Sequence, residues 1–374
     1  MMHLVLAWAV LFPQEAEGFL KSAEYKQQQR DAEGALADFT RALEMNPKLA
    51  AAWYGRGVLL SNKGQLDRAL ADYSKAIEAD PKFAKAYFSR AILRSYRNDD
   101  EGALADYGKA VESDPSYGKA WFNRGLLRSG RKDYDGAIGD FTRAIGVNGA
   151  DIDAWFNRGN AWAAKGDHEK AIFDYSKVVE LKPTHSAAYV YRGDCQARKG
   201  DAIAAMLDFT RAIEMNPKDA EAFYFRGHAN YDRQAWSTAL DDFKKAYDLN
   251  RLSAVRTDTC ELRLWAVRAR MGQSDVATAE LKAYIAKERR GGRPNDWFST
   301  VAAFLAGDQP EAAFLESAPS KAESCDAHFY AAVKRLAKKD AAGARELLKK
   351  ALATGITDTP EASSVRAELE ALGK

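Results

Sequence analysis

The sequence has few of the residues, and none of the short motifs, on which most enzyme classes depend. Its 374 residues include only 3 cysteines and 5 histidines. It contains no P-loop, no dinucleotide-binding glycine pattern, no HExxH pair and no nucleophile elbow. These absences predict a protein that is not an enzyme and that has neither a cofactor nor a metal site.

The chain also lacks an excess of charge and a long hydrophobic run. The formal net charge is +2 and charged residues are spread along the sequence, so no strong field would attract nucleic acid. The apolar run from Leu4 to Phe12 is far shorter than the roughly 20 residues of a transmembrane helix. The basic residues near Gly291, from Lys287 to Arg293, read as part of a solvated linker that spans Arg289 to Asp296. We therefore expect neither a nucleic-acid partner nor a transmembrane span.

What the sequence does have is a period of 34 residues. An alanine stands twelve positions before each proline of the period, and Gly149 takes the place of the one missing proline. A fixed period of this length indicates a stacked repeat array rather than a single globular core. The five prolines are Pro47, Pro81, Pro115, Pro183 and Pro217.

Each unit of this period reads as two amphipathic helices. With Ala16 as position 1 of the first unit, positions 4 and 24 are aromatic in all seven units and position 8 is glycine or alanine. Positions 4, 8 and 11 share one helix face, as do positions 20, 24 and 27, and the small residues at 8 and 20 let the two helices approach closely. Gly64 and Gly200 are placed to end first helices with positive φ, and the proline ends the second helix.

This pattern resembles the tetratricopeptide repeat (TPR) family. It is clearest in Trp155-Phe156-Asn157-Arg158-Gly159, followed by Ala171-Ile172-Phe173-Asp174-Tyr175 and Pro183. The resemblance implies an all-α fold, in which helix hairpins form a right-handed superhelical solenoid that ends in a divergent helical region and a capping helix. We expect seven repeats in residues 16–252 and the divergent TPR-like region in residues 253–374. Residues 1–15 read either as a signal segment or as an N-terminal cap helix.

The divergent region carries its own helix signals. Glu261–Arg270 and Val276–Ile285 form an irregular eighth hairpin around Gly272, and Trp297–Ala306 is a short apolar helix. A further hairpin opens at Cys325 and closes with residues 344–352. The last amphipathic segment, Pro360–Leu372, is expected to cover the final apolar face of the array.

Two charged rows depart from the usual pattern of the family, in which positions 7 and 23 are mostly apolar. Both positions lie eight residues from the turn of the hairpin, so their side chains are expected to meet at the same height on adjacent helices. We predict an internal arginine–aspartate ladder, in preference to a row of arginines that grips an acidic ligand. Its members are Arg56, Asp72, Arg90, Asp106, Arg124, Asp140, Arg158, Asp174, Arg192, Asp208, Arg226 and Asp242.

Residues that change from repeat to repeat indicate where a partner binds. Positions 2, 5, 9 and 12 form a separate stripe of the first helix, which the family resemblance places on the concave side of the array. The stripe is aromatic and aliphatic in repeats two to four and more polar in repeats five to seven, which favours a protein or peptide partner with a hydrophobic segment. The predicted groove residues are Tyr54, Lys85, Phe88, Ile92, Lys119, Phe122, Asn123, Leu126, Phe156, Asn157, Asn160 and Tyr224.

Asn123 and Asn157 occupy position 6 of successive repeats. They match groove asparagines that hold peptide backbone in other TPR superhelices, and an amide offers both a donor and an acceptor for this task. The alternative is that they are solvated or bonded to their own helical turn. A carboxylate clamp for chaperone tails is absent, because position 5 is aromatic or aliphatic and position 6 is never arginine.

The last third of the chain resembles bacterial cell-envelope TPR adaptors of the new-lipoprotein-I type. The resemblance rests on Asn295-Asp296-Trp297, on Cys325-Asp326-Ala327-His328-Phe329-Tyr330 and on the alanine-rich hairpin that follows. It implies a periplasmic or secreted adaptor. Those relatives carry a lipid-modified cysteine near the N-terminus, whereas the first cysteine here is Cys195. A cytoplasmic TPR regulator is the alternative.

Two classes of function follow from these patterns. The first is a non-catalytic interaction scaffold, and the second is an enzyme-associated or weakly catalytic protein that uses the C-terminal region. Cys325 and His328 are one helical turn apart, but helix packing explains them better than a thiol–imidazole pair does. In an exported protein Cys260 and Cys325 could form a disulfide. Homo-oligomerisation through an end of the array is left open.

Overall fold

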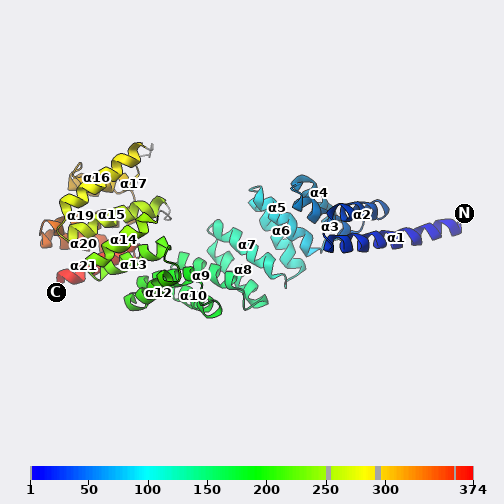
Figure 1. Ribbon diagram of the computed structural model, residues 1–374, viewed down its shortest axis with the longest axis horizontal. Helices are drawn as coiled ribbons and strands as arrows, with labels where there is room; N and C mark the ends of the chain where they lie inside the picture. The colour runs from blue at the N-terminus through cyan, green and yellow to red at the C-terminus, as the bar shows by residue number, and fades with distance from the viewer. Residues whose placement is uncertain (1, 250–253, 291–295, 358, 374) are drawn as a thin grey trace. The chain divides into compact units, whose positions relative to one another are not determined.

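Every regular element in the part of the chain that the structure describes is an α-helix. This computed structural model describes residues 2–249, 254–290, 296–357 and 359–373. Consecutive helices pair as hairpins, and Figure 1 shows these pairs from α1 and α2 onward. The predicted all-α fold of repeated hairpins is confirmed. The handedness of the superhelix stays a prediction.

The helices gather into two compact units, Met1–Ala161 and Trp162–Lys374. The division falls inside α9 (Ile152–Ala164), the first helix of the fifth repeat. The predicted border between the regular repeats and the divergent region lies at 252/253, outside the described residues, and it stays a prediction.

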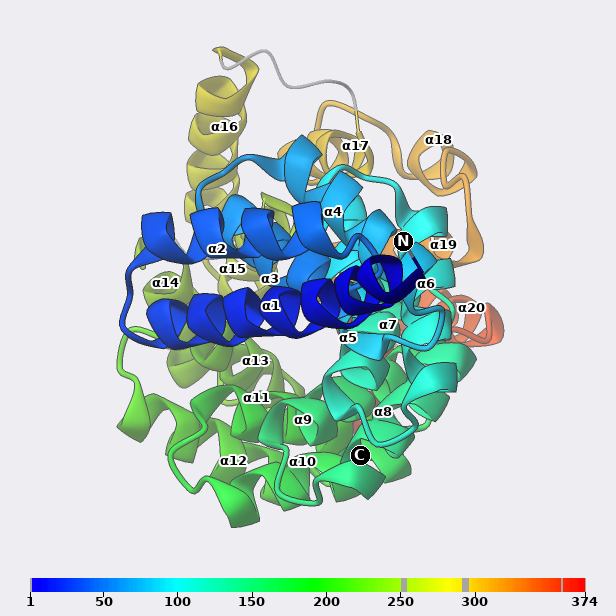
Figure 2. The same ribbon diagram turned by 90° about the vertical axis from the view of Figure 1, so that its right-hand side faces the viewer.

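The first unit contains the hairpins of repeats one to four, and Figure 2 gives a second view of them. Residues 2–15 form the beginning of α1, and their role as a signal segment or as a cap helix stays a prediction. The helices are α1 (Met2–Gln28), α2 (Ala32–Met45), α3 (Ala50–Asn62), α4 (Leu66–Ala79), α5 (Ala84–Tyr96), α6 (Asp100–Ser113), α7 (Gly118–Gly130) and α8 (Tyr134–Val147).

The second unit continues the repeats and adds the divergent helices. Its regular hairpins include α10 (His168–Leu181), α11 (Ser186–Arg198), α12 (Ala202–Met215), α13 (Ala220–Asp232) and α14 (Trp236–Asp248). They are followed by α15 (Ala254–Arg270), α16 (Ser274–Arg290), α17 (Trp297–Ala306), α18 (Glu311–Glu316), α19 (Lys321–Ala337), α20 (Ala341–Ala353) and α21 (Pro360–Gly373). Arg289 and Arg290 belong to α16 and not to a linker, which corrects the sequence interpretation; residues 291–295 lie outside the described residues.

Each hairpin closes around an aromatic ring at position 24. In repeat four the Phe141 ring lies so close to Gly125 that a Cβ atom there would be 2.8 Å from the ring. The ring is fully buried, as is Ala137 at position 20 of the same helix. A glycine or alanine at position 8 is therefore what allows the two helices to pack at this distance.

Aromatic residues at position 4 join each repeat to the one before it. The indole nitrogens of Trp53, Trp121 and Trp155 donate to the carbonyl oxygens of Pro47, Pro115 and Gly149 at 2.8, 2.9 and 2.8 Å. Gly149 thus accepts the same hydrogen bond as the prolines of the period. The missing proline changes the residue type at this turn but not the contact.

Turns inside the hairpins use a left-handed residue, as predicted. Gly64 and Gly200 have φ of 74° and 89°. Asn98 and Lys132 take the same conformation at φ of 61° and 64° in repeats whose turn has no glycine. A side chain in this region is strained relative to glycine.

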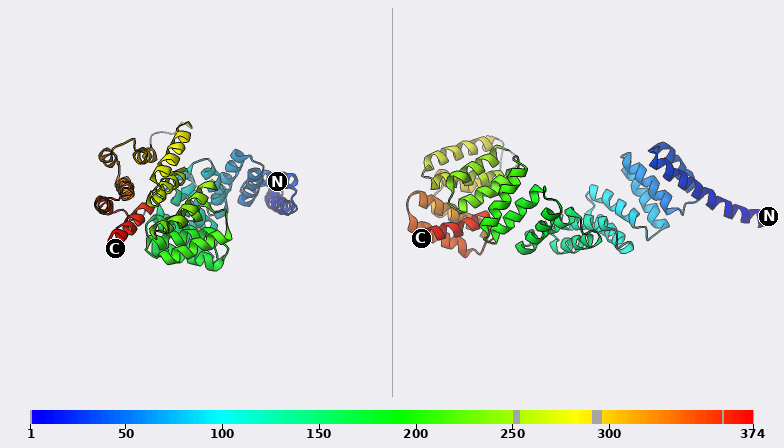
Figure 3. Two further views of the ribbon diagram at one scale, coloured as in Figure 1. Left: turned by 60° about the vertical axis from the view of Figure 1, so that its left-hand side comes forward. Right: turned by 60° about the horizontal axis from the view of Figure 1, so that its bottom comes forward.

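The C-terminal helix α21 packs against α13, α19 and α20, and Figure 3 shows it in red beside the green and orange helices. Its inward contacts are largely polar: Glu361 pairs with the fully buried Arg263 at 3.1 Å, and Tyr231 donates to Glu368 at 2.9 Å. The predicted cap is present, but it covers the first helix of repeat seven through buried polar contacts as well as apolar ones. Within the searched residues, no helix has the length and apolar character to cross a membrane.

Candidate partner-binding face

Arginine and aspartate side chains meet inside the hairpins in a repeated geometry. Arg56 donates through Nε and Nη2 to both oxygens of Asp72 at 2.7 and 2.9 Å. Arg90 and Asp106, and Arg124 and Asp140, form the same two-pronged pairs in the first unit. Arg192 with Asp208 and Arg226 with Asp242 do so in the second unit. Such bidentate pairs fix orientation as well as charge.

Each ladder arginine is held by further contacts that the sequence interpretation missed. The guanidinium group of Arg124 lies 4.8 Å from the centre of the Trp121 ring, and the other ladder arginines lie over the ring at position 4 of their own helix. In four repeats the Nη1 atom also reaches a hydroxyl at position 25 of the preceding repeat, as from Arg90 to Ser74 at 3.0 Å. The conserved spacing of Ser and Thr at position 25 was the available signal.

Two aspartates receive a second arginine. Arg94 donates to Asp106 and Arg128 donates to Asp140, both at 2.9 Å, while Asn230 takes the equivalent place at Asp242. Arg158 and Asp174 belong to different units, and their pairing stays a prediction. Within the first unit, Arg158 donates to Thr142 at 3.0 Å.

The first helices of repeats two to four carry a row of apolar side chains, which we call the apolar stripe: Tyr54, Phe88, Ile92, Phe122 and Leu126. The three rings are half-buried because each packs on the position 24 ring of its own hairpin, as Phe88 does on Tyr107 at 5.8 Å. Ile92 and Leu126 are 41% and 40% exposed. The rings of the apolar stripe are therefore fixed by packing inside their hairpins, whereas Ile92 and Leu126 are open to solvent.

Phe83 and Tyr117 extend the apolar stripe, and the sequence interpretation missed both. They occupy position 34, just before the next first helix, and their rings lie 5.1 and 4.9 Å from those of Tyr54 and Phe88. Burial and then the nearby Tyr54 raise the pKa of Tyr117 to about 12. In later repeats position 34 holds Asp151, His185 or Asp219, whose side chains cap the following helix. The change at position 34 from an aromatic residue to a helix-capping residue is visible in the sequence, and it could have identified Phe83 and Tyr117 as part of the stripe.

The other predicted groove residues of the first unit differ in their environments. Lys85 and Lys119 are exposed at the edge of the apolar stripe, and Phe156 and Asn160 are half-buried on α9. Burial raises the pKa of Tyr107 to about 12, an effect that Asn123 partly offsets by hydrogen bonding to it. Asn157 donates to the carbonyl of Asp153 in its own helix at 2.8 Å. This geometry corresponds to the alternative reading of Asn157, in which the amide bonds to its own turn.

Tyr224 is not an exposed groove residue, and this prediction is wrong. Its side chain is 3% exposed in the core of the second unit, with its ring 4.6 Å from that of His228. The physical reason is that α21 packs on α13, and that Arg263 of α15 and Phe329 of α19 contact Tyr231 on the same helix, so the first-helix stripe of repeat seven is already covered.

Cys325 and His328 each contact another residue: Thr354 hydrogen-bonds to Cys325, and His328 reaches the backbone of Ser324. The Nδ1 atom of His328 lies 2.7 Å from the carbonyl oxygen of Ser324, and burial raises the pKa of Cys325 to about 11. The three cysteines are buried free thiols, so Cys260 and Cys325 form no disulfide. Among the described residues, no cluster of side chains is arranged to hold a metal ion.

Comparison with known proteins bears on the repeats. A tetratricopeptide repeat model matches residues 50–83 and 152–185, and a second tetratricopeptide repeat model matches residues 88–146 and 204–254. The chain contains tetratricopeptide repeats. The matches end at residue 254, and the resemblance of the last third to new-lipoprotein-I adaptors stays a prediction.

Several solved structures, two of them described as TPR proteins, are similar to parts of the chain. YrrB, described as a TPR protein with an unusual peptide-binding site, is 28% identical over 49% of this chain and 95% of its own, with a TM-score of 0.47. MamA is 27% identical over 44% of this chain and 96% of its own, with a TM-score of 0.42. A TPR protein from Parabacteroides merdae is 22% identical over 67% of this chain and 99% of its own, with a TM-score of 0.44. No curated protein sequence matches the chain.

Proposed function

We propose that this protein is a non-catalytic interaction scaffold whose apolar stripe binds a peptide or helix of a partner protein. The observation that carries the proposal is the exposure of Ile92 and Leu126, 41% and 40%, beside a row of half-buried rings on successive first helices. Apolar side chains grouped in this way on a protein surface mark interaction sites more often than scattered ones do. An amphipathic helix or an extended segment with hydrophobic anchors fits such a row.

The charge around the apolar stripe narrows the class of partner. Lys85 and Lys119 are exposed beside it, and no carboxylate pairs with either in the described residues. The ladder arginines do not contribute, because the aspartates of their hairpins neutralise them. A hydrophobic segment with acidic flanks would therefore be favoured over one with basic flanks.

Selection from a library of random peptides tests this proposal. We expect the selected peptides to carry hydrophobic residues at helical or alternating spacing together with Asp or Glu. The double substitution Ile92→Asp and Leu126→Asp should weaken their binding at least about tenfold, because charged groups would have to be buried against apolar anchors. Both sites are exposed, so the hairpins should remain folded.

The matched control is Val147→Asp on α8, since Val147 is 46% exposed but lies on a second helix. Peptides that bind the double variant as tightly as they bind the native protein would refute the proposal. Lys85→Glu with Lys119→Glu should reduce the affinity for acidic peptides and its dependence on salt.

The cell-envelope location is a separate part of the proposal. It is supported only by the resemblance of the last third of the chain to envelope adaptors and by the apolar run near the N-terminus. Fractionation of the native cell with sequencing of the mature N-terminus tests it: an uncleaved chain in the cytoplasm would leave the scaffold role intact and contradict the location.

A further inference from the structure

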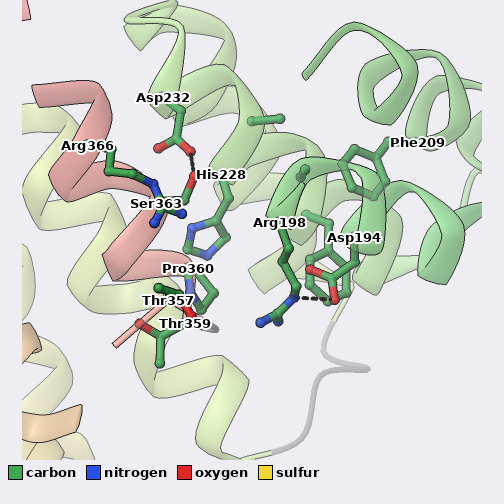
Figure 4. Close-up of a pocket in the computed structure, with 13 residues that line it drawn as sticks. Asp194, Arg198, Phe209, His228, Asp232, Thr357, Thr359, Pro360, Ser363 and Arg366 are labelled. Carbon is green, nitrogen blue, oxygen red and sulfur yellow. Dashed lines mark hydrogen bonds and ion pairs between the residues drawn. The ribbon is translucent and has the colours of Figure 1, made fainter. Parts of the chain in front are cut away.

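A pocket in the second unit lies between α11, α13 and the start of α21, and we call it the His228 pocket. Figure 4 shows His228 between Arg198 of α11 and the residues of α21. The inner pocket opens into a wider one of about 820 Å³, which shares Ala197, Ala229 and Arg366 with it. It is remote in sequence from the apolar stripe, and its assignment does not depend on the proposed function.

His228 is the unusual group in this pocket. Its side chain is only 6% exposed, and neither ring nitrogen has a hydrogen-bond partner. The ring packs edge-on against Tyr224 at 4.6 Å and Phe243 at 5.0 Å, which fixes its orientation. A buried polar group without a partner is costly, so a site that leaves two such atoms in one ring is prepared for a hydrogen-bonding ligand.

His228 is uncharged at physiological pH. Burial lowers its pKa well below the ordinary value, and the positive charges of Arg263 and Arg198 lower it further. A neutral imidazole has one N–H donor and one acceptor nitrogen. A ligand atom that can donate or accept, such as a hydroxyl or an amide, can satisfy it in either tautomer.

The remaining charges of the pocket balance one another. Arg198 pairs with Asp194 at 2.9 Å, and Asp232 accepts hydrogen bonds from Ser363 and Ser364 and interacts with Arg366. Two arginines thus face two aspartates, and the pocket offers no net attraction to an ion. A charged group would lose its hydration without finding an unpaired counter-charge.

The other walls are mostly apolar, with Thr357 and Thr359 just before α21 as the further polar residues. Ala197, Phe209, Phe225, Ala229 and Pro360 surround the approach to the histidine. We propose that the His228 pocket binds a small uncharged group that carries a hydroxyl or an amide on a compact hydrocarbon. The group belongs either to a free small molecule or to a side chain such as Asn or Thr of a bound peptide.

Three small molecules of similar shape test whether the pocket prefers an uncharged ligand: propionamide is neutral, propionate is an anion and propylamine is a cation. We expect propionamide to produce a saturable shift of the ring-nitrogen resonances of His228 in the histidine-labelled full-length protein. The two charged probes should need at least about tenfold higher concentrations, because each would bury an unpaired charge. Equal binding of propionate, or no shift with propionamide, would overturn the proposal.

Two variants assign the binding to this site. His228→Leu removes both ring nitrogens at similar side-chain volume. Ala197→Leu fills the approach to the pocket while leaving the histidine in place. Each variant should abolish saturable binding of propionamide in ligand-detected NMR. Ala163→Leu, at the same repeat position on α9, is the matched control and should bind as the native protein does. Undiminished binding by Ala197→Leu would place the ligand elsewhere and refute the proposal.

A short peptide with one asparagine, acetyl-Ala-Asn-Ala-amide, distinguishes the two sources of the group. Tighter binding than propionamide supports a peptide side chain that enters from the wide mouth. Weaker binding supports a free small molecule as the ligand.

Discussion

The ladder arginines are each held from several directions at once. Arg124 makes two hydrogen bonds to Asp140 and lies over the Trp121 ring, and its side chain is 14% exposed. An arginine in this position is part of the hairpin and is not available to a ligand. At the residue scale, the 34-residue period therefore specifies the polar contacts inside each hairpin as well as the apolar ones.

Asp140→Ala should destabilise the first unit by about 3 kcal/mol. Asp140 is 3% exposed at its side chain and accepts from Arg124 and Arg128, so its removal takes the counter-charge from the partly buried Arg124 and leaves Arg128 with Asp133 at 3.7 Å. Asp72→Ala should cost less, because only Arg56 of the described residues donates to Asp72 as a cation. Urea unfolding measures both changes.

Glu112→Ala is the control for this pair of variants. Glu112 forms an exposed pair with Lys109, so its loss should change the free energy of unfolding by no more than about 0.5 kcal/mol. Equal effects of Asp140→Ala and Glu112→Ala would contradict a structural role of the ladder.

At the element scale, the turns inside the hairpins show where the repeats are strained. Lys132 adopts φ of 64° at the turn between α7 and α8, where other repeats have glycine, such as Gly64. A side chain costs energy in this conformation, although glycine costs more backbone entropy on folding. The strain is local, because the turn geometry is otherwise the same in both kinds of repeat.

Lys132→Gly should raise the stability of the first unit by about 0.5–1 kcal/mol, because relief of the left-handed strain outweighs the added backbone entropy. Gly64→Ala should lower it by about 1 kcal/mol for the opposite reason. Gly139→Ala, in an exposed and unstrained part of α8, should be stabilising and serves as the control for helix propensity. A loss of stability in Lys132→Gly would show that the lysine side chain contributes a contact that outweighs its strain.

For the whole molecule, the main feature is the unequal burial of charge in the two units. In the first unit the buried aspartate of each hairpin pairs with a basic residue, which is Lys26 in repeat one and an arginine in repeats two to four. The second unit also buries Glu361 and Glu368 near Arg263, with the half-buried Asp326 in the same cluster. Burial, and then the negative charge of Glu361, raise the pKa of Asp326 to about 8, while Trp297 and Arg263 oppose this rise. The stability of the second unit should therefore depend on pH near neutrality.

The sign of this dependence follows from the folded protein holding the Asp326 proton more strongly than the unfolded chain does. The contribution to stability is fully present below the unfolded pKa, near 3.8, and is lost as pH rises to about 8. Asp326→Asn keeps the side chain neutral, so it should stabilise the second unit at about pH 8 and change little at about pH 4. Thermal unfolding across this interval checks the prediction; a parallel loss in native protein and variant would contradict it.

The sequence by itself determined what lies within one 34-residue unit. The pairing of Arg124 with Asp140 and the packing of Phe141 on Gly125 link residues sixteen apart, whose meeting follows from the length of two helices and a turn. Local geometry repeats wherever the pattern repeats, so these contacts could be predicted from one row of residues.

Only the tertiary structure decided where the array stops offering a surface. Asp232 contacts Ser363, 131 residues later in the chain, and this return of α21 buries Tyr224 and forms the His228 pocket. The 34-residue period cannot predict the contact between Asp232 and Ser363, because α21 lies outside the repeats. The position of α21 depends instead on buried charge pairs such as Arg263 with Glu361. Whether the first-helix stripe is exposed thus depends on the helices packed around it. In repeats two to four Ile92 and Leu126 of the stripe remain exposed. In repeat seven the last helix of the chain, α21, covers the stripe.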